Sequence, residues 1–212
     1  MGAAGLAVTG WAGGADAPET ERSPAEWQRL GVERFEAGDA AGSVAAFDAY
    51  LAARPDALPH HWQRGISLYY AGDFEEGVKQ FEAHQTVNAQ DIENAAWHFL
   101  CVARASDIGE ARKRILPQGR DPRVPLSEVY ALYAGTGTPE AVLEAAKAGE
   151  PDAEALRNQL CYAHLYLGLY YEVAGDAERS RQHIEEASET YAMPHYMGKV
   201  AQVHRKSFKV ED

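Results

Sequence analysis

Trp27-Gln28-Arg29-Leu30-Gly31, followed by Gly38-Asp39 and Phe47, is the stretch that decides the fold, because its residues return in order further along the chain. The returning glycine, Gly-Asp pair and phenylalanine each lie 34 residues after the first. A period of this length predicts stacked supersecondary units that share one continuous core. The second copy consists of Trp62-Gln63-Arg64-Gly65, Gly72-Asp73 and Phe81. A third copy near the C-terminus contains Leu167-Gly168, Tyr171 and Gly175-Asp176.

Each copy carries residue types that begin and end helices. The glycine of a Gly-Asp pair adopts the left-handed conformation that closes one helix, and the aspartate caps the next. Ser23-Pro24-Ala25-Glu26 and Asp73-Phe74-Glu75-Glu76 also have the spacing of a capping box. A glycine in the middle of a helix costs about 1 kcal/mol relative to alanine. We therefore expect Gly31, Gly65 and Gly168 where a neighbouring helix approaches closely. The copies are predicted to be α-helical hairpins.

The repeats resemble the tetratricopeptide repeat, whose signature is W-x2-L-G-x2-Y followed by A, F, A and P. The resemblance implies a solenoid of helical hairpins whose first helices line a concave, protein-binding face. A looser similarity to bacterial envelope lipoproteins of the NlpI kind is confined to residues 163–175. The first copy matches the signature at Trp27, Leu30, Gly31, Phe47 and Pro55. The second matches at Gly65 and Phe81, with Trp62 shifted by one position, and the C-terminal copy matches at Leu167, Gly168, Tyr171 and Ala187.

Helical periodicity continues between the recognisable copies. The segment 117–125, with three prolines and a glycine, is predicted to be a loop or a bend. We predict an all-α protein, a solenoid of about five hairpins in one domain over residues 23–212. A last helix is expected to cover the open end of the stack, as terminal repeats require. The helices expected after the second copy span 91–106, 108–116, 126–134, 138–148, 152–174, 176–191 and 196–205.

Residues 1–22 are expected to lie outside that domain. Residues 1–11 are small and mostly apolar, and Ala15-Asp16-Ala17 fits a small-x-small cleavage site. No Lys or Arg precedes the apolar stretch, so the positive region of a secretory signal is missing. Two interpretations stay open: the remnant of a signal peptide, which would place the protein in the periplasm, or a disordered tail rich in glycine and alanine. Pro18 and the polar linker after the cleavage-like site slightly favour export over a cytoplasmic location.

The formal net charge of −12 restricts the classes of partner. A negative field repels nucleic acid and anionic lipid and attracts basic segments. The same charge also serves simply to keep a protein soluble. No apolar run reaches the length of a membrane-spanning helix. We therefore expect neither a nucleic-acid partner nor a membrane span.

Two cysteines, Cys101 and Cys161, lie on apolar segments and are expected to be small buried thiols. A sharper alternative joins them with two histidines. His98 and Cys101 are three apart on one predicted helix, and Cys161 and His164 are three apart on another, so each pair shares a face. Together they offer the ligands of a zinc site or of a small metal- or thiol-dependent enzyme. The separation of their hairpins argues against this alternative, and no cofactor is expected.

No catalytic motif stands out, so recognition is the predicted function. Residues at the usual groove positions would form the concave face and hold a protein or peptide segment, apolar with basic flanks. Aromatic residues and arginine dominate binding hot spots. A tightly curled solenoid would instead bury the same residues as core. The partner-binding residues that we predict are Phe35, Trp62, Ile66, Tyr69, Tyr70, Arg104 and Tyr162. Among them, Trp62, Tyr69 and Tyr70 form an aromatic cluster that we expect to be partly exposed to solvent.

One known function of the family is disfavoured. Tetratricopeptide domains that bind the C-terminal carboxylate of heat-shock chaperones use lysine, asparagine and arginine at fixed groove positions. Those positions here hold Gln28, Val32, Gln63, Glu93 and Trp97, which would not neutralise a carboxylate. We therefore predict an adaptor of another kind.

Overall fold

The computed structural model describes residues 22–208, and every regular element in that range is helical. The all-α prediction is therefore confirmed. The expected helices agree with the observed bounds to within three residues, except that the helix expected to end at Tyr191 ends at Glu185 and is followed by a π-helical turn. The proposed leader or tail falls almost wholly on residues 1–21, outside the described range. None of the described helices is both long enough and apolar enough to cross a bilayer.

Ten of the helices follow one another as five contacting pairs within the described range. A 3-10 helix, η2 (Pro55–His60), joins the first two pairs, and a π-helical turn, η3 (Glu186–Thr190), precedes the last helix, α11 (Tyr196–Ser207). The pairs are α1 (Pro24–Ala37) with α2 (Ala40–Ala53), α3 (Trp62–Ala71) with α4 (Phe74–Gln85), α5 (Ile92–Ala105) with α6 (Ile108–Arg114), α7 (Leu126–Ala134) with α8 (Pro139–Ala145), and α9 (Ala153–Val173) with α10 (Ala177–Glu185).

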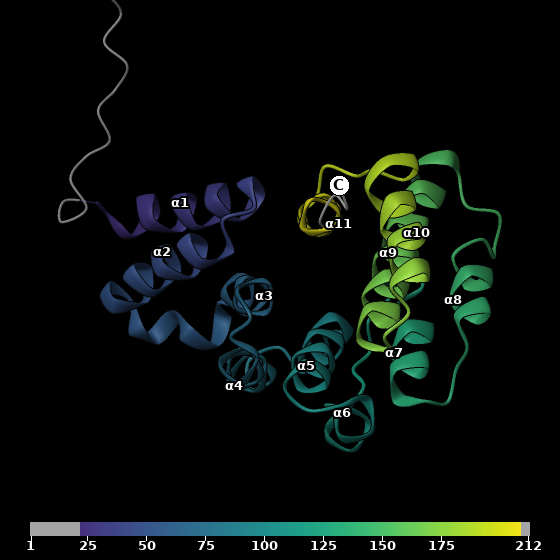
Figure 1. Ribbon diagram of the computed structural model, residues 1–212, viewed down its shortest axis with the longest axis horizontal. Coiled ribbons are helices and arrows are strands. Elements are labelled where there is room, and N and C mark those ends of the chain that lie inside the picture. The colour runs from purple at the N-terminus through teal and green to yellow at the C-terminus, as the bar shows by residue number, and fades with distance from the viewer. Residues whose placement is uncertain (1–21, 209–212) are drawn as a thin grey trace, which may run out of the picture.

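The paired helices form an arc that runs from α1 round to α10 (Figure 1). The middle of the arc is α5, in which every residue from Ile92 to Ala103 is buried. A helix that is buried on all sides lies in the core, and α5 contacts α3, α4, α6, α7 and α9. The largest buried ring of this core belongs to Trp97.

Most of the predicted caps are present. Ser23 and Glu26 form both hydrogen bonds of a capping box, and Asp39 and Asp176 each accept a hydrogen bond from the backbone N–H three residues later. Asp73 makes no side-chain capping bond, so the second capping box is wrong. Its expected partner, Glu76, accepts a hydrogen bond from Lys79 Nζ at 2.6 Å and does not reach back to the start of the helix.

The three mid-helix glycines each lie against a large side chain of the second helix in their pair. A methyl group on Gly65 would lie 2.6 Å from Phe81 Cζ, and one on Gly31 would lie 2.3 Å from Phe47 Cε1. In the C-terminal pair, the corresponding distance from Gly168 to Ile184 Cγ1 is 2.6 Å. The predicted close approach is confirmed in all three copies, and these contacts set how closely each pair packs.

Replacing Gly65 with leucine is expected to destabilise the protein by about 1–3 kcal/mol, because the new side chain must displace Phe81. Thermal or denaturant unfolding followed by circular dichroism measures the change. Gly109→Leu is the matched control, since Gly109 is exposed on α6 and its added methyl would meet only the Asp107 carboxylate, at 3.0 Å. Equal melting temperatures for the two variants would show that the Gly65 contact does not limit packing.

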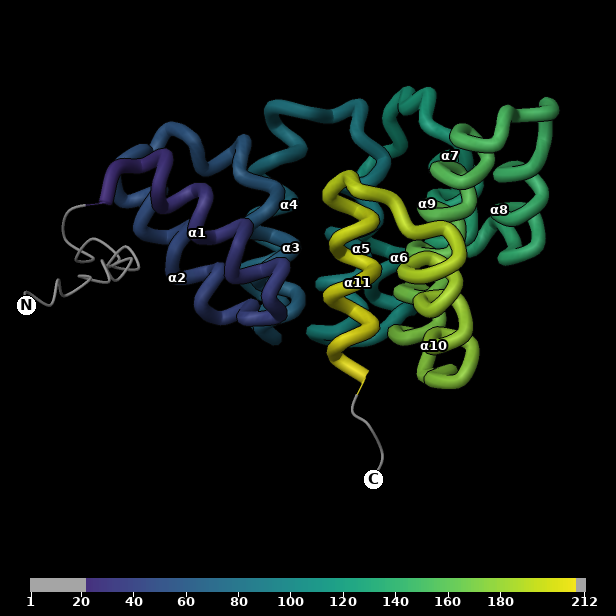
Figure 2. Tube along the Cα trace, turned by 90° about the horizontal axis from the view of Figure 1, so that it is seen from above, coloured from purple at the N-terminus to yellow at the C-terminus, as the bar shows by residue number. Residues whose placement is uncertain are grey.

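The last helix does not have its expected place. We expected α11 to cover the open end of the stack, but it lies inside the arc and contacts α1 at one end of the chain as well as α9 and α10 at the other. Figure 1 shows α11 end-on between α1 and α10, and Figure 2 shows it running between the two halves. Gly198 allows the tight return, because a methyl group there would lie 2.1 Å from the Met193 carbonyl oxygen.

The apolar face of α11 explains this correction. Val200, Ala201 and Val203 are almost completely buried on the concave side. The ring of Tyr196 stacks on Phe35 with centroids 5.6 Å apart. A helix at the open end would leave much of this apolar area in water, at about 25 cal/mol for each Å².

Candidate functional site

α11 divides the predicted concave groove into two pockets. Beyond its stacking on Phe35, Tyr196 meets the edge of Trp62 at 4.9 Å between centroids. Towards the other end of α11, Tyr70 Oη and His204 Nδ1 share a hydrogen bond of 3.0 Å. One pocket, which we call the proximal pocket, opens beside the first turn of α11. The other, the distal pocket, opens beside its last turn.

The predicted binding residues are therefore not neighbours along one open surface. Trp62, Ile66 and Tyr162 line the proximal pocket, whereas the other predicted residues of α3 and α5 line the distal one. Phe35 is wholly buried beneath α11. The distal pocket has a volume of about 290 Å³ and is lined by Tyr69, Tyr70, Ala71, Gly72, Phe74, Arg104, Glu172 and Ser207.

The expected partial exposure of the aromatic cluster holds for two of its three members. Trp62 and Tyr70 are half-buried, but Tyr69 is 3% exposed, so the expectation is wrong for this residue. Its ring packs against Trp97, and its hydroxyl donates a 2.5 Å hydrogen bond to Glu172. Burial, together with the neighbouring Glu172 charge, raises the pKa of Tyr69 well above its usual value.

The distal pocket already contains a cation from the chain itself. The guanidinium carbon of Arg104 lies 4.9 Å from the ring centroid of Phe74 and 5.9 Å from that of Tyr69. The same side chain donates a 2.7 Å hydrogen bond to Glu172. A guanidinium over aromatic faces and beside a carboxylate is a stable arrangement. Arg104 is therefore already paired within the chain, so it is less available to a binding partner than an unpaired arginine would be.

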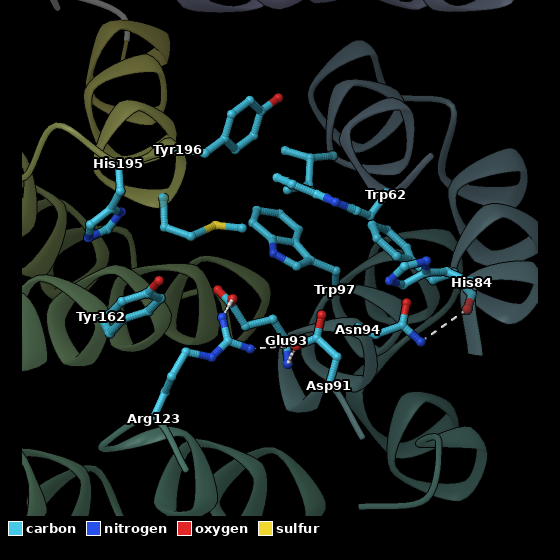
Figure 3. A pocket seen from close by; sticks show the side chains of 13 residues that line it. Trp62, His84, Asp91, Glu93, Asn94, Trp97, Arg123, Tyr162, His195 and Tyr196 are labelled. Atoms are coloured by element: carbon cyan, nitrogen blue, oxygen red, sulfur yellow. Dashed lines mark hydrogen bonds and ion pairs between the residues drawn. The ribbon is translucent and has the colours of Figure 1, made fainter. Parts of the chain in front are cut away.

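The proximal pocket combines aromatic walls with a charged floor (Figure 3). Its volume is about 310 Å³, at the lower end of the range for ligand pockets. Side chains from α3, α4, α5, α9, α11 and the loop before α7 converge on it. The lining residues are Trp62, Ile66, Phe81, His84, Asp91, Glu93, Asn94, Trp97, Arg123, Tyr162, His195, Tyr196 and Met197.

The charged floor is an ion-pair network that the sequence did not predict. Arg123 Nη1 pairs with Glu93, and Nη2 pairs with Asp91 at 2.6 Å and with Asp121 at 2.5 Å. One guanidinium therefore faces three carboxylates. The Oη of Tyr166 donates a further 2.5 Å hydrogen bond to Glu93.

Burial controls the protonation of this network. It raises the pKa of Glu93 to about 7, although the charge of Arg123 and the hydrogen bond from Tyr166 act in the opposite direction. Burial also disfavours the charged guanidinium of Arg123, but the hydrogen bond to Asp121 and the charges of Glu93 and Asp91 outweigh it and raise the pKa of Arg123. Glu93 is thus the group in this floor that exchanges a proton near neutral pH.

Sequence reasoning missed most of this floor. In the sequence, Glu93 and Trp97 are notable only because they do not fit a carboxylate clamp, and Arg123 belongs to a predicted loop. The loop folds back so that Arg123 reaches the start of α5, about 30 residues earlier in the chain. A single basic residue in a proline-rich loop carries no signal for that contact.

The four residues of the alternative metal or thiol site do not converge. His98 lies 3.4 Å from Glu82, and His164 lies 3.0 Å from His183. Cys101 packs under Gly77, and Cys161 Sγ approaches the Ala187 carbonyl oxygen at 3.7 Å. Within residues 22–208, no three histidine, cysteine or acidic side chains are grouped as metal ligands would be.

Both cysteines are the buried free thiols that the sequence predicts. Burial raises the pKa of Cys101, and raises that of Cys161 to about 11. Because the thiolate is the reactive form, neither side chain is prepared to act as a nucleophile at neutral pH.

No known protein-family model matches this chain.

We expect the raised pKa of Glu93 to make stability fall as the pH rises. Between the unfolded value of 4.5 and about 7, the folded state holds the proton more tightly, so the free energy of unfolding decreases with pH across that window. The contribution is at most on the order of 3 kcal/mol. Urea unfolding of the unaltered protein and of Glu93→Gln, each from pH 5 to pH 8, measures it.

The glutamine variant is expected to lose this slope, whatever constant offset the weakened ion pair with Arg123 adds. Glu75→Gln, at an exposed position on α4, should keep the slope of the unaltered protein. A stability difference between Glu93→Gln and the unaltered protein that stays constant from pH 5 to pH 8 would contradict the assignment.

Proposed function

We propose that this protein is a non-enzymatic adaptor of the tetratricopeptide type, whose concave groove binds an amphipathic helical segment of another protein. The observation that carries the proposal is α11, which lies in the groove with its apolar side buried. Domains that bind helices in grooves bury one apolar face of the ligand in the same way. The chain thus supplies its own example of a ligand that the groove accepts.

The composition of α11 supports a partner that is apolar with basic flanks. Its buried face contains Val200, Ala201 and Val203, and its last turn contains Arg205 and Lys206. Lys206 Nζ donates a 3.0 Å hydrogen bond to the Glu36 carbonyl oxygen at the end of α1. A chain with a net charge of −12 also attracts basic segments over a distance.

The repeat geometry supports the tetratricopeptide assignment. Glycine faces a large side chain of the paired helix in three copies, and two of these copies lie 34 residues apart. The first helices of four pairs supply most of the residues that face α11 or the two pockets. Concave surfaces of stacked helical repeats are binding surfaces.

Two polar atoms of α11 are buried without a hydrogen-bond partner, which favours the replacement of α11 in the groove by a helix of a partner protein. They are His204 Nε2 and Tyr196 Oη. Each such atom costs about 1–3 kcal/mol. A partner helix that carries no unsatisfied polar atom at the two corresponding positions would avoid this cost. Such a helix would therefore compete with α11 for the groove.

Binding of an α11 peptide in trans tests the proposal. A fluorescent peptide of residues 192–212 is titrated into protein truncated after Tyr191 and into the full chain, with fluorescence anisotropy as the readout. We expect saturable binding to the truncated protein and at least about tenfold weaker binding to the full chain, in which α11 competes.

Trp62→Ala in the truncated protein is expected to weaken peptide binding by at least about 2 kcal/mol, as hot-spot truncations do. Trp27→Ala is the matched control, because Trp27 is half-buried on α1 and lines neither pocket. If the truncated protein does not fold, a full chain cleaved between Tyr191 and His195 replaces it. Absence of peptide binding to a folded protein with an open groove would refute the proposal.

A further inference from the structure

One polar atom beside the proximal pocket, Asn94 Oδ1, is buried without a hydrogen-bond partner. Asn94 is 2% exposed, and its side-chain nitrogen donates to the Phe81 carbonyl oxygen at 3.1 Å and to Gln85 Oε1 at 2.9 Å. Both partners are acceptors, so the amide orientation is determined. Its Oδ1 is then a buried acceptor with no donor, and Figure 3 shows this oxygen on the side facing His84. An N–H or O–H donor on a bound group would satisfy it.

The net negative charge of the floor favours a ligand with a positive charge. Asp91, Glu93 and Asp121 surround Arg123, so the carboxylates outnumber the guanidinium. An anion entering the pocket would meet Asp91 and Glu93, which both line it. A cation would instead be attracted to the unbalanced carboxylate charge.

The walls suit a cation as well. The aromatic side chains that line the pocket include Trp62 of α3, Trp97 of α5, Tyr162 of α9 and Tyr196 of α11, each from a different helix. Figure 3 shows these rings around the space above Glu93 and Arg123. Aromatic faces attract ammonium and guanidinium groups, and more strongly when water is excluded.

The distal pocket shows the same chemistry with its cation in place. There the guanidinium of Arg104 lies over Phe74 and Tyr69 and pairs with Glu172. In the proximal pocket the corresponding aromatic and acidic groups are present, but Arg123 lies in the floor, bound to three carboxylates. Room of about 310 Å³ remains above it.

We propose that the proximal pocket binds an organic cation with N–H donors, a guanidinium or a primary ammonium group. The carboxylates of Asp91 and Glu93 and the Oδ1 of Asn94 accept its hydrogen bonds, and the aromatic walls hold its apolar stem. The cation comes either from a basic side chain of a partner protein or from a free amine. This site is complete with α11 in place, so it does not depend on the groove function proposed above.

Titration of the full chain with small cations tests the site. The readout is the indole N–H signals of the ¹⁵N-labelled protein, with Trp62 assigned through Trp62→Phe and Trp97 through Trp97→Phe. We expect butylguanidinium and butylammonium to shift these signals saturably. Tetramethylammonium, which has no N–H donor, should bind about tenfold more weakly, as expected for the loss of one charge-assisted hydrogen bond. Butyrate should not bind.

Asp91→Asn is the informative variant, because asparagine keeps the shape and remains a good N-cap for α5. It should weaken butylguanidinium binding by about tenfold, the change expected when one hydrogen bond to a charged group is weakened. Asp73→Asn is the matched control, since Asp73 occupies the N-cap of α4 and lines neither pocket. Its affinity should be that of the unaltered protein.

Two further probes distinguish the sources of the cation. Agmatine represents a free amine, and a blocked pentapeptide of four alanines around one arginine represents a partner's side chain. Whichever of the two binds more tightly identifies the source, and either result supports the cation site. Saturable binding of butyrate, equal binding of tetramethylammonium, equal affinity of Asp91→Asn and Asp73→Asn, or no saturable shift with any cation would overturn it.

Discussion

The close contact between a helical glycine and a large side chain of the next helix is the constraint on which the rest of the structure depends. Gly65 against Phe81 and Gly31 against Phe47 allow the two helices of a pair to approach more closely than any side chain at the glycine would permit. The same contact recurs in the fifth pair, where Gly168 lies against Ile184, and the five pairs form an arc. The inner side of that arc carries Trp62 of the proximal pocket and Tyr69 and Tyr70 of the distal pocket.

The inner side of the arc is apolar and is stable only when it is shielded from water. α11 packs against this side and shields most of it. Burying its apolar face against α1 and α9 removes hydrophobic area from water on both partners. The cover is incomplete, because one helix cannot fill the space between helices that diverge along the arc. The two pockets are what remains, one beside each end of α11.

The two pockets share one chemistry, aromatic faces beside carboxylates, but they differ in how the negative charge is compensated. In the distal pocket Arg104 pairs with Glu172, so the charges are balanced. In the proximal pocket one guanidinium, that of Arg123, faces three carboxylates. One of them belongs to Glu93, whose pKa is raised to about 7 because burial removes the carboxyl group from water. A buried acidic group with this pKa near a cavity is a common feature of binding sites. The imbalance in charge therefore points to the proximal pocket as the place where a further positive group is accommodated.

The sequence by itself determined the local elements: the helical hairpins, most of their bounds, the three glycine contacts and the burial of both cysteines. These follow from residue type and spacing within one hairpin, where few alternatives compete. The resemblance to a known repeat also placed Trp62, Ile66 and Tyr162 among the partner-binding residues, and these three line the proximal pocket.

Only the tertiary structure decided what the loops bring together. The segment 117–125 carries Arg123 to Glu93, and the turn before α11 directs that helix into the arc and not onto its end. The same packing keeps His98 and Cys101 apart from Cys161 and His164. Loops and turns of this kind have no period, and the partners they join are decided by which distant surfaces bury the most apolar area and balance the most charge.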